Sequence, residues 1–257
     1  MQSGAYSFFI VKEIVKDRHD IKGNERKHIE ELGENKMKKF VFVSDFDGTL
    51  TEKDFYQMII EDRLGEMGKA LFDAWKRKEY KDRDFLSKIY KAVDMDESEL
   101  IEYILTIKWD KYATHLIERV QQSGGEFVIL SAGCSYYIDP ILRKQNLKHI
   151  KVYSNPGVYH NRGIELKIDK DSPYFSDVYG IDKQKVVCDL KNQFEKVYFV
   201  GDSAPDTLPS QIADITFAKG CLQEILKKEN TPFIAVDHFK DIEDYLIQER
   251  ILATQSL

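Results

Sequence analysis

The stretch FVFVSDFDGTLTEKD, residues 40–54, decides the fold class of this 257-residue chain. An apolar run of strand type ends in Asp45 and Asp47, which flank a single phenylalanine, and a glycine and two threonines follow. Carboxylates this close to a buried strand are costly unless another group neutralises them. Either the two acids cap and turn the chain, or they hold a cation and take part in a reaction. The rest of the sequence has to decide between these interpretations.

Several other short runs have the composition of buried parallel strands. Each is rich in β-branched or aromatic residues, lacks polar alternation, and ends in small or acidic residues. Helical stretches separate the runs, as a doubly wound parallel α/β sheet requires. In such a sheet ligands bind beyond the carboxyl ends of the strands, so these run ends should share one edge. The runs are 40–45, 126–133, 148–155, 196–203 and 214–220.

Two insertions interrupt the predicted sheet. Residues 54–109 contain four stretches with helical spacing of apolar residues, which predicts an inserted helical-bundle cap over the site. Residues 157–180 alternate around Gly163, which predicts a small β-hairpin followed by a loop. The α/β core would then comprise residues 37–53 and 110–257. The larger apolar side chains of the cap are expected to form its own core: Phe55, Met58, Phe72, Trp75, Phe85 and Tyr103.

The composition, with 42% hydrophobic and 32% charged residues, is that of an ordinary folded globule. A formal net charge of −6 argues against a nucleic-acid partner, and no apolar run approaches bilayer length, so no membrane partner is expected. Three widely spaced cysteines without a CxxC pair suit a reducing cytosol and predict a cytoplasmic protein. Residues 1–36 precede a plausible start at Met37 and are expected to form a poorly ordered or partly helical extension. None of these features indicates the oligomeric state.

Two later strand ends add polar groups to the same edge. The segment GDSAPD places Asp202 and Asp206 at one strand end, and LSAG places Ser131 at another. Four carboxylates converging at one edge would repel each other strongly unless a divalent cation lay among them. Carboxylate and carbonyl oxygens are ligands that suit Mg²⁺ rather than zinc. The pattern therefore predicts a magnesium site.

A phosphate ester as substrate would give these groups a complete set of tasks. One carboxylate can attack phosphorus, while a second can protonate the leaving oxygen and later activate water. A hydroxyl and nearby loop amides can hold the phosphoryl oxygens, and Mg²⁺ and a lysine can offset the charge. Lys183 and Lys185, at a predicted helix start, are both candidates for that lysine. The expected partner is a small phosphorylated metabolite.

In their order along the chain, these residues resemble the four signatures of the haloacid-dehalogenase superfamily of phosphohydrolases. The matching segments are DFDGTLT at 45–51, Ser131, Lys183, and GDSAPD at 201–206. The resemblance covers residues 38–249 and implies a Rossmann-like core with a phosphatase site. It implies that Asp45 is the nucleophile.

The resemblance gives roles to the other residues as well. It implies that Asp47 is the general acid and base, that Ser131 belongs to the catalytic set, and that Lys183 rather than Lys185 is the site lysine. Mg²⁺ would be held by Asp45, the carbonyl of Asp47 and Asp202, with Asp206 supporting the metal shell. The expected substrate contacts are Thr49, Asp54, Ala132 and Gly133.

The helical insert places the chain beside two groups of the superfamily, the phosphoserine phosphatases and the 2-hydroxy-3-keto-5-methylthiopentenyl-1-phosphate phosphatases of methionine salvage. Asp54 stands where phosphoserine phosphatases typically use a glutamate, and LSAGCSYYIDPIL and SDVYGIDKQKVV also resemble the salvage group. The segment 157–180 departs from that group because it lacks a cysteine-rich stretch. We therefore expect a phosphatase for the salvage ester, with phosphoserine as the alternative substrate. A phosphomutase and a non-catalytic binding module of the same fold are the alternatives of other classes.

Overall fold

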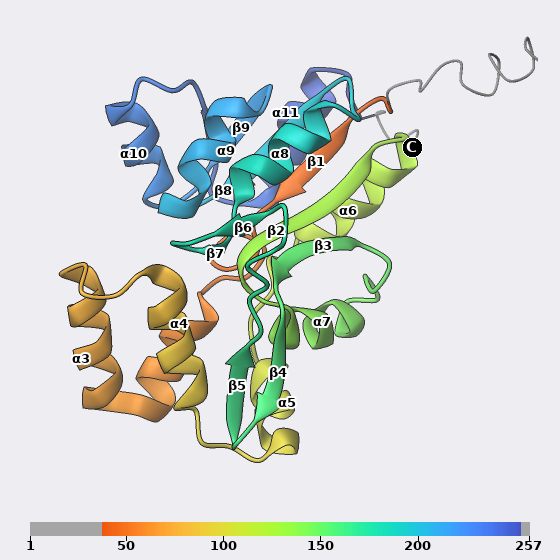
Figure 1. The fold of residues 1–257 in the computed structure, drawn as a ribbon. Helices are drawn as coiled ribbons and strands as arrows, with labels where there is room; N and C mark the ends of the chain where they lie inside the picture. Colours follow the sequence, from red (N-terminus) through yellow and green to blue (C-terminus); the bar gives the residue numbers. More distant parts are fainter. Residues whose placement is uncertain (1–37, 253–257) are drawn as a thin grey trace, which may run out of the picture. The chain divides into compact units, whose positions relative to one another are not determined.

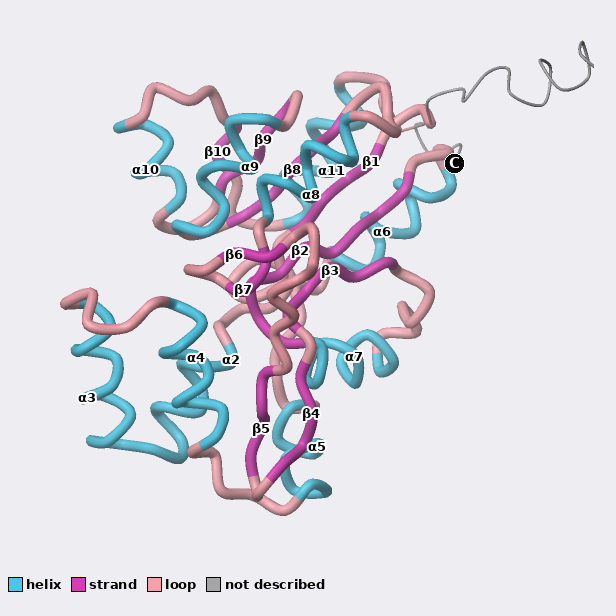
Figure 2. The backbone as a smooth tube through the Cα atoms, viewed as in Figure 1, coloured by secondary structure: helices cyan, strands magenta, loops and turns pink. Residues whose placement is uncertain are grey.

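A six-stranded parallel sheet forms the centre of the computed structural model, which describes residues 38–252 (Figures 1 and 2). Strand β1 is central, and its Val43 pairs in register with Val128 on one side and Phe199 on the other. All strand pairs of this sheet are parallel, which confirms the predicted doubly wound sheet. In spatial order the strands are β10 (Ile234–Ala235), β9 (Ile215–Ala218), β8 (Val197–Gly201), β1 (Val41–Ser44), β2 (Glu126–Cys134) and β3 (Lys151–Asn155).

Helices cover both faces of the sheet, because successive side chains of a strand point to opposite faces. The core helices are α6 (Ala113–Gln122), α7 (Ser135–Lys144), α8 (Lys183–Lys191), α9 (Thr207–Ile212), α10 (Leu222–Lys228) and α11 (Phe239–Gln248). Val43 of β1 belongs to a buried cluster that includes Val186 of α8. Its neighbour Phe42 belongs to a second cluster, with Leu116 of α6 and Ile242 of α11. The two clusters are the two hydrophobic layers of the core.

The segment between β1 and α6 is helical, and it lies on the side toward which the β1 arrow points (Figure 1). Its elements are α2 (Phe55–Ile59), the π-helix η1 (Ile60–Leu64), α3 (Gly65–Lys76), α4 (Asp82–Lys91) and α5 (Glu97–Ile104). The sequence predicted one helical stretch over residues 55–64, and the structure divides it into α2 and η1. The chain turns at Gly65, whose φ of 50° is accessible to glycine at little cost. We call this segment the cap.

A second excursion from the sheet, residues 157–181, carries two small antiparallel hairpins. They are formed by β4 (Gly157–His160) with β5 (Gly163–Leu166), and by β6 (Phe175–Ser176) with β7 (Gly180–Ile181). The first hairpin was predicted around Gly163, but its turn consists of Asn161 and Arg162, with φ values of 47° and 61°. Gly163 opens β5 instead and approaches the cap closely: a Cβ there would lie 2.7 Å from the carbonyl oxygen of Tyr90.

The 157–181 excursion contacts the cap near both ends of α4. At the end of α4, the N–H of Met95 donates to the carbonyl of Arg162 at 2.9 Å. At its start, the N–H of Arg83 donates to the carbonyl of Val178 at 3.0 Å, and the Arg83 guanidinium pairs with Asp177 at 3.0 Å. The excursion therefore links the core to the cap at two separate places.

The predicted N-terminal extension, residues 1–36, lies outside the described residues, as do residues 253–257 of the predicted core. Between residues 38 and 252, no helix combines the length and the apolar character that crossing a membrane would require.

Phe42 gives a direct test of the sheet packing. It is fully buried, and its ring stacks on Phe127, Phe217 and Tyr198 at centroid distances of 5.4, 6.0 and 6.3 Å. We expect Phe42→Ala to lower the free energy of unfolding by about 3–5 kcal/mol, measured by urea denaturation. Leu208→Ala, at a side chain that is 49% exposed, is the control and should change it by less than about 0.5 kcal/mol. Equal effects of the two substitutions would contradict this packing.

Candidate active site

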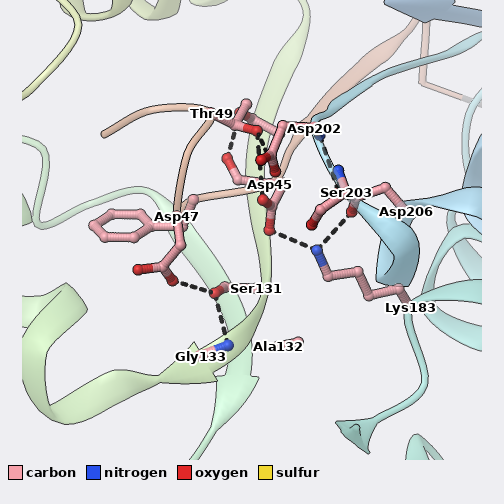
Figure 3. A network of polar contacts seen from close by, with 12 residues as sticks. Asp45, Asp47, Thr49, Ser131, Ala132, Gly133, Lys183, Asp202, Ser203 and Asp206 are labelled. Atoms are coloured by element: carbon pink, nitrogen blue, oxygen red, sulfur yellow. Dashed lines mark hydrogen bonds and ion pairs between the residues drawn. The ribbon is translucent and has the colours of Figure 1, made fainter. Parts of the chain in front are cut away.

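The parallel sheet brings three of the predicted acids together at its carboxyl edge (Figure 3). Asp45 directly follows β1, and its N–H continues the strand ladder by donating to the carbonyl of Val200 at 2.9 Å. Asp202 follows β8, and Asp206 ends the short 3-10 helix η2 (Ala204–Asp206). One carboxylate oxygen from each acid lies within 4.8 Å of the other two. Two adjacent strand ends and the short helix after one of them thus build an acidic cluster.

Lys183, the first residue of α8, is buried and bonds two of these acids at once. Its Nζ lies 2.5 Å from Oδ1 of Asp45 and 2.7 Å from Oδ1 of Asp206. Burial disfavours the charge on Lys183, but Asp206 and Asp45 outweigh this and raise its pKa above the ordinary value. Lys185 directs its amine to the carbonyl of Phe175 at 3.3 Å instead, in an exposed position. The structure therefore places Lys183, and not Lys185, among the acids of the site, a choice that the residues alone left open.

Asp206 is held from both sides. Its Oδ2 accepts the N–H groups of Asp202 at 3.1 Å and Ser203 at 3.2 Å, while its Oδ1 accepts from Lys183. Gly201 leaves the space for this side chain, because a Cβ at that position would lie 2.4 Å from Cγ of Asp206. With both oxygens engaged, Asp206 is better suited to fix its neighbours than to bind a ligand itself.

The charge of this cluster fits a divalent cation. Burial, followed by the charges of Asp45 and Asp206, raises the pKa of Asp202 to about 9. Burial and Asp45 raise the pKa of Asp206 to about 6 against the opposing effect of Lys183. The buried acids therefore need more positive charge than one lysine supplies, and carboxylate oxygens are the donors that Mg²⁺ prefers. Thr49, a predicted substrate contact, places its hydroxyl 3.4 Å from both Asp45 Oδ2 and Asp202 Oδ1.

Asp47 lies apart from this cluster and is held by neutral groups. Its Oδ1 accepts the N–H of Phe55 at 3.1 Å, and its Oδ2 accepts the hydroxyl of Tyr137 at 2.6 Å. Burial raises the pKa of Asp47, and the hydrogen bonds from Tyr137 and Phe55 oppose the rise only in part. Burial and Asp47 raise the pKa of Tyr137 well above its ordinary value, so this phenol stays protonated and donates. Sequence reasoning did not single out Tyr137.

The carboxyl-terminal end of β2 carries three further predicted residues. The Ser131 hydroxyl lies 3.4 Å from Oδ2 of Asp47 and accepts the N–H of Gly133 at 2.9 Å, as Figure 3 shows. The carbonyl of Ala132 accepts the side-chain amide of Asn155 at 2.8 Å. The end of β2 is thus tied to β3, and the Ser131 hydroxyl is directed at the site.

A cavity of about 180 Å³ opens between these groups and the cap. The predicted residues on its floor are Asp45, Asp47, Asp54, Ser131, Ala132, Gly133 and Lys183. Its walls include Tyr56, Trp75, Phe85, Leu86, Tyr90 and Tyr179. Trp75 and Phe85, which were expected only to pack inside the cap, stack on each other at 4.8 Å and also line this cavity. Thr49, Asp202 and Asp206 lie outside the lining.

Asp54 stands at the N-cap of α2 and lines the cavity. Its Oδ2 accepts the side-chain amide of Gln57 at 2.7 Å. Burial, followed by the charges of Asp47 and Asp45, raises the pKa of Asp54 to about 7, although a hydrogen bond with Tyr56 lowers it. A carboxyl group with such a pKa can accept or donate a hydrogen bond near neutral pH, which suits contact with a polar group of a ligand.

Residues 42–207 match the family described as haloacid dehalogenase-like hydrolases. The chain belongs to this family. The match spans the first acidic motif, the end of β2 with Ser131, Lys183 and the second acidic motif, so all four predicted segments of this hydrolase fall within it.

Curated relatives of this haloacid dehalogenase-like hydrolase are named as phosphatases. A 2-hydroxy-3-keto-5-methylthiopentenyl-1-phosphate phosphatase of Microcystis aeruginosa is 24% identical over 213 residues, which cover 82% of this chain and 99% of that protein. A polyol phosphate phosphatase of Saccharomyces cerevisiae is 26% identical over 231 residues, covering 80% and 92%. A solved phosphoserine phosphatase, in a phospho-aspartyl intermediate analogue form, has the same fold, with a TM-score of 0.60, 19% identity and coverage of 81% and 99%. Family and relatives together identify the chain as a phosphatase.

Gly48 tests how closely the first acidic motif approaches the second in this hydrolase. Its φ is 71°, and a Cβ there would lie 2.5 Å from Oδ2 of Asp202. We expect Gly48→Ala to lower the free energy of unfolding by about 1–2 kcal/mol and to displace the Asp202 carboxylate. That displacement should lower kcat/KM for p-nitrophenyl phosphate at least about tenfold.

Gly124→Ala is the matched control for this substitution. Gly124 has a similar φ of 78°, and no atom lies within 4 Å of the added Cβ. Gly124→Ala should therefore lose stability to a similar extent and retain activity. An equal loss of activity in both variants would show that backbone strain, and not the contact with Asp202, is responsible.

Proposed function

We propose that the chain is an Mg²⁺-dependent phosphomonoesterase that forms a phosphoaspartate at Asp45. The observation that carries this proposal is the different environment of two carboxylates on one cavity floor. Asp45 is paired with the Lys183 ammonium group, whose positive charge would favour attack of this side chain on an anionic phosphate ester. Asp47 is held by neutral donors and has a raised pKa, which suits a group that must carry and release a proton.

The proposed reaction has two steps on these residues. In the first, an Asp45 oxygen attacks phosphorus, the bond from phosphorus to the ester oxygen breaks, and the proton of Asp47 passes to that oxygen. In the second, water attacks the phosphoaspartate, Asp47 takes a proton from the water, and phosphate leaves with Asp45 restored. Ser131 would hold a phosphoryl oxygen with its hydroxyl, and Lys183 would offset charge throughout.

Mg²⁺ is the proposed cofactor, held by Asp45, the carbonyl of Asp47 and Asp202. When bound, it would neutralise the charge that accumulates on the phosphoryl oxygens. The three hydrogen bonds to Asp206 support its assignment to the surrounding shell, where it would orient Asp202 and Lys183. Thr49 would contact the same acids rather than the organic part of the substrate, because it lies outside the cavity lining.

We propose 2-hydroxy-3-keto-5-methylthiopentenyl-1-phosphate as the substrate. The aromatic wall formed by Trp75 and Phe85, with Leu86 beside it, suits an apolar group such as the methylthio end of that ester. Asp54 also lines the cavity, where it can meet a hydroxyl or keto oxygen. A phosphoserine substrate would need a cation for its carboxylate. The Lys76 amine lines the cavity, but it lies over the Trp75 ring at 4.7 Å, and this contact favours the apolar ester over phosphoserine.

The volume of the cavity and the state of the thiols support two coarser proposals. A space of about 180 Å³ suits a small phosphorylated metabolite. Cys134, Cys188 and Cys221 are all free thiols, which is consistent with a reducing, cytoplasmic location.

The first test concerns chemistry and metal. We expect the purified chain to hydrolyse p-nitrophenyl phosphate with Mg²⁺, to lose this activity in EDTA, and to regain it when Mg²⁺ is restored. Asp45→Asn should lower kcat at least about a thousandfold, because the amide cannot act as the nucleophile. Asp139→Asn, the same change at an exposed position on α7, should leave kcat unchanged. Full activity of Asp45→Asn would refute the assignment of the nucleophile.

The second test concerns the substrate. A panel of phosphate esters should include the salvage ester, phosphoserine and polyol phosphates. We expect kcat/KM to be at least about tenfold higher for the salvage ester than for the other two, because they lack an apolar end for the aromatic wall. Trp75→Ala should reduce this preference by raising KM for the salvage ester. A higher kcat/KM for phosphoserine would refute the weight given to Asp54 and the wall.

A further inference from the structure

The hydroxyl of Tyr137 lies 2.6 Å from Oδ2 of Asp47 and donates its only proton to that oxygen. This contact is shorter than the one from Ser131 to the same oxygen, at 3.4 Å, and the one from the N–H of Phe55 to Oδ1, at 3.1 Å. Donors on both oxygens define the plane of the carboxyl group, because rotation about its Cβ–Cγ bond would break both bonds. Of these two hydrogen bonds, the one from Tyr137 is the shorter.

Tyr137 is itself held in place on all sides. Its side chain is fully buried on α7, with ring centroids of Phe55 and Phe46 at 4.7 and 6.1 Å. Gly133 makes the contact with Asp47 possible, since a Cβ there would lie 1.8 Å from the Tyr137 hydroxyl oxygen and 2.7 Å from Asp47 Oδ2. The backbone therefore leaves the space of one methyl group, and the hydroxyl of Tyr137 occupies it.

A second tyrosine, Tyr90, packs against Tyr137. Tyr90 of α4 is buried, and its ring packs edge-on against that of Tyr137, with a distance of 5.9 Å between the ring centroids. This packing restricts movement of the Tyr137 ring away from Asp47. Tyr90 also lines the cavity, so a chain of contacts runs from the cap wall through Tyr137 to Asp47.

We propose that Tyr137, supported by Tyr90, is a positioning residue that holds Asp47 in the orientation needed to protonate the leaving oxygen. This inference rests on the proposed role of Asp47 as general acid. In that step the bond between phosphorus and the ester oxygen breaks and the Asp47 proton passes to the oxygen, while both tyrosines keep their own protons. Without the Tyr137 hydroxyl, the Asp47 carboxyl group could still donate a proton, but it would no longer be held in the orientation that delivers this proton to the leaving oxygen.

The test compares leaving groups that need different amounts of protonation. An alkyl phosphate such as glycerol 2-phosphate releases a strongly basic alkoxide, whereas p-nitrophenyl phosphate releases a phenolate that leaves without a proton. In Tyr137→Phe, kcat/KM for the alkyl ester should fall roughly 10- to 100-fold, and kcat/KM for p-nitrophenyl phosphate should fall less than about threefold. This ratio reports the step up to phosphoryl transfer, so slow hydrolysis of the phosphoaspartate does not obscure it.

Two further variants complete the experiment. Tyr136→Phe makes the same change one residue away, at a hydroxyl that bonds Glu97 near the surface, and should alter neither substrate's kcat/KM. Tyr90→Leu, which removes the ring that packs against Tyr137, should show the selectivity of Tyr137→Phe at a smaller size, about threefold to tenfold on the alkyl ester. If Tyr137→Phe does not fold, Tyr90→Leu decides the matter, and unchanged kinetics in that variant overturn the proposal.

The outcomes also separate this proposal from the proposed function. Equal losses on both esters, or no loss on either, in a folded Tyr137→Phe would overturn the positioning role while the wild-type chain still hydrolyses phosphate esters. A wild-type chain inactive on all phosphate esters with Mg²⁺ would overturn the proposed function itself. A loss confined to the alkyl ester supports both.

Discussion

One buried ammonium group makes it possible for several acids to share the end of a hydrophobic sheet. Lys183 bonds Asp45 and Asp206 together, and the repulsion between their carboxylates would otherwise oppose folding. The lysine can reach both because α8 begins beside the ends of β1 and β8, which are neighbours in the sheet. The order of the strands thus determines the electrostatics of the site. The charge that Lys183 leaves uncompensated is what makes a cation a fitting ligand.

The core and the cap supply different groups to the site. The carboxyl-terminal ends of the strands, β2 among them, and the start of α8 supply the charged and hydroxyl groups of the floor, whereas α3 and α4 supply the aromatic wall. Asp47 contacts both the cap and the core. One of its carboxylate oxygens accepts the N–H of Phe55, the first residue of α2, and the other accepts the hydroxyl of Tyr137 on α7. In the proposed reaction, recognition of the organic group and delivery of the proton would therefore depend on the same arrangement of cap and core. A change in the cap would then alter rate as well as selectivity.

The sequence was most informative where topology alone fixes a contact. The meeting of Asp45 with Asp202 follows from parallel strands with common carboxyl ends, so strand composition was enough to predict it. Helical spacing showed that Trp75 would be covered, but it could not show whether protein or ligand would cover it. Tyr137 could not be told from Tyr136, because only the packing of α7 decides which ring is buried. The strand β10 was missed because two residues are too few to show a period.

The contacts between the 157–181 excursion and the cap differ in kind from the packing at α2. Arg162 pairs with Asp94 and Lys81 with Asp177 at exposed positions, whereas Phe55 packs on Tyr137 inside the core. Exposed ion pairs weaken as salt rises, and buried aromatic contacts do not. Salt should therefore weaken the exposed ion pairs between the excursion and the cap while leaving the packing at α2 unchanged. The cap thus has two attachments of different chemistry, and only one of them responds to the surrounding electrolyte.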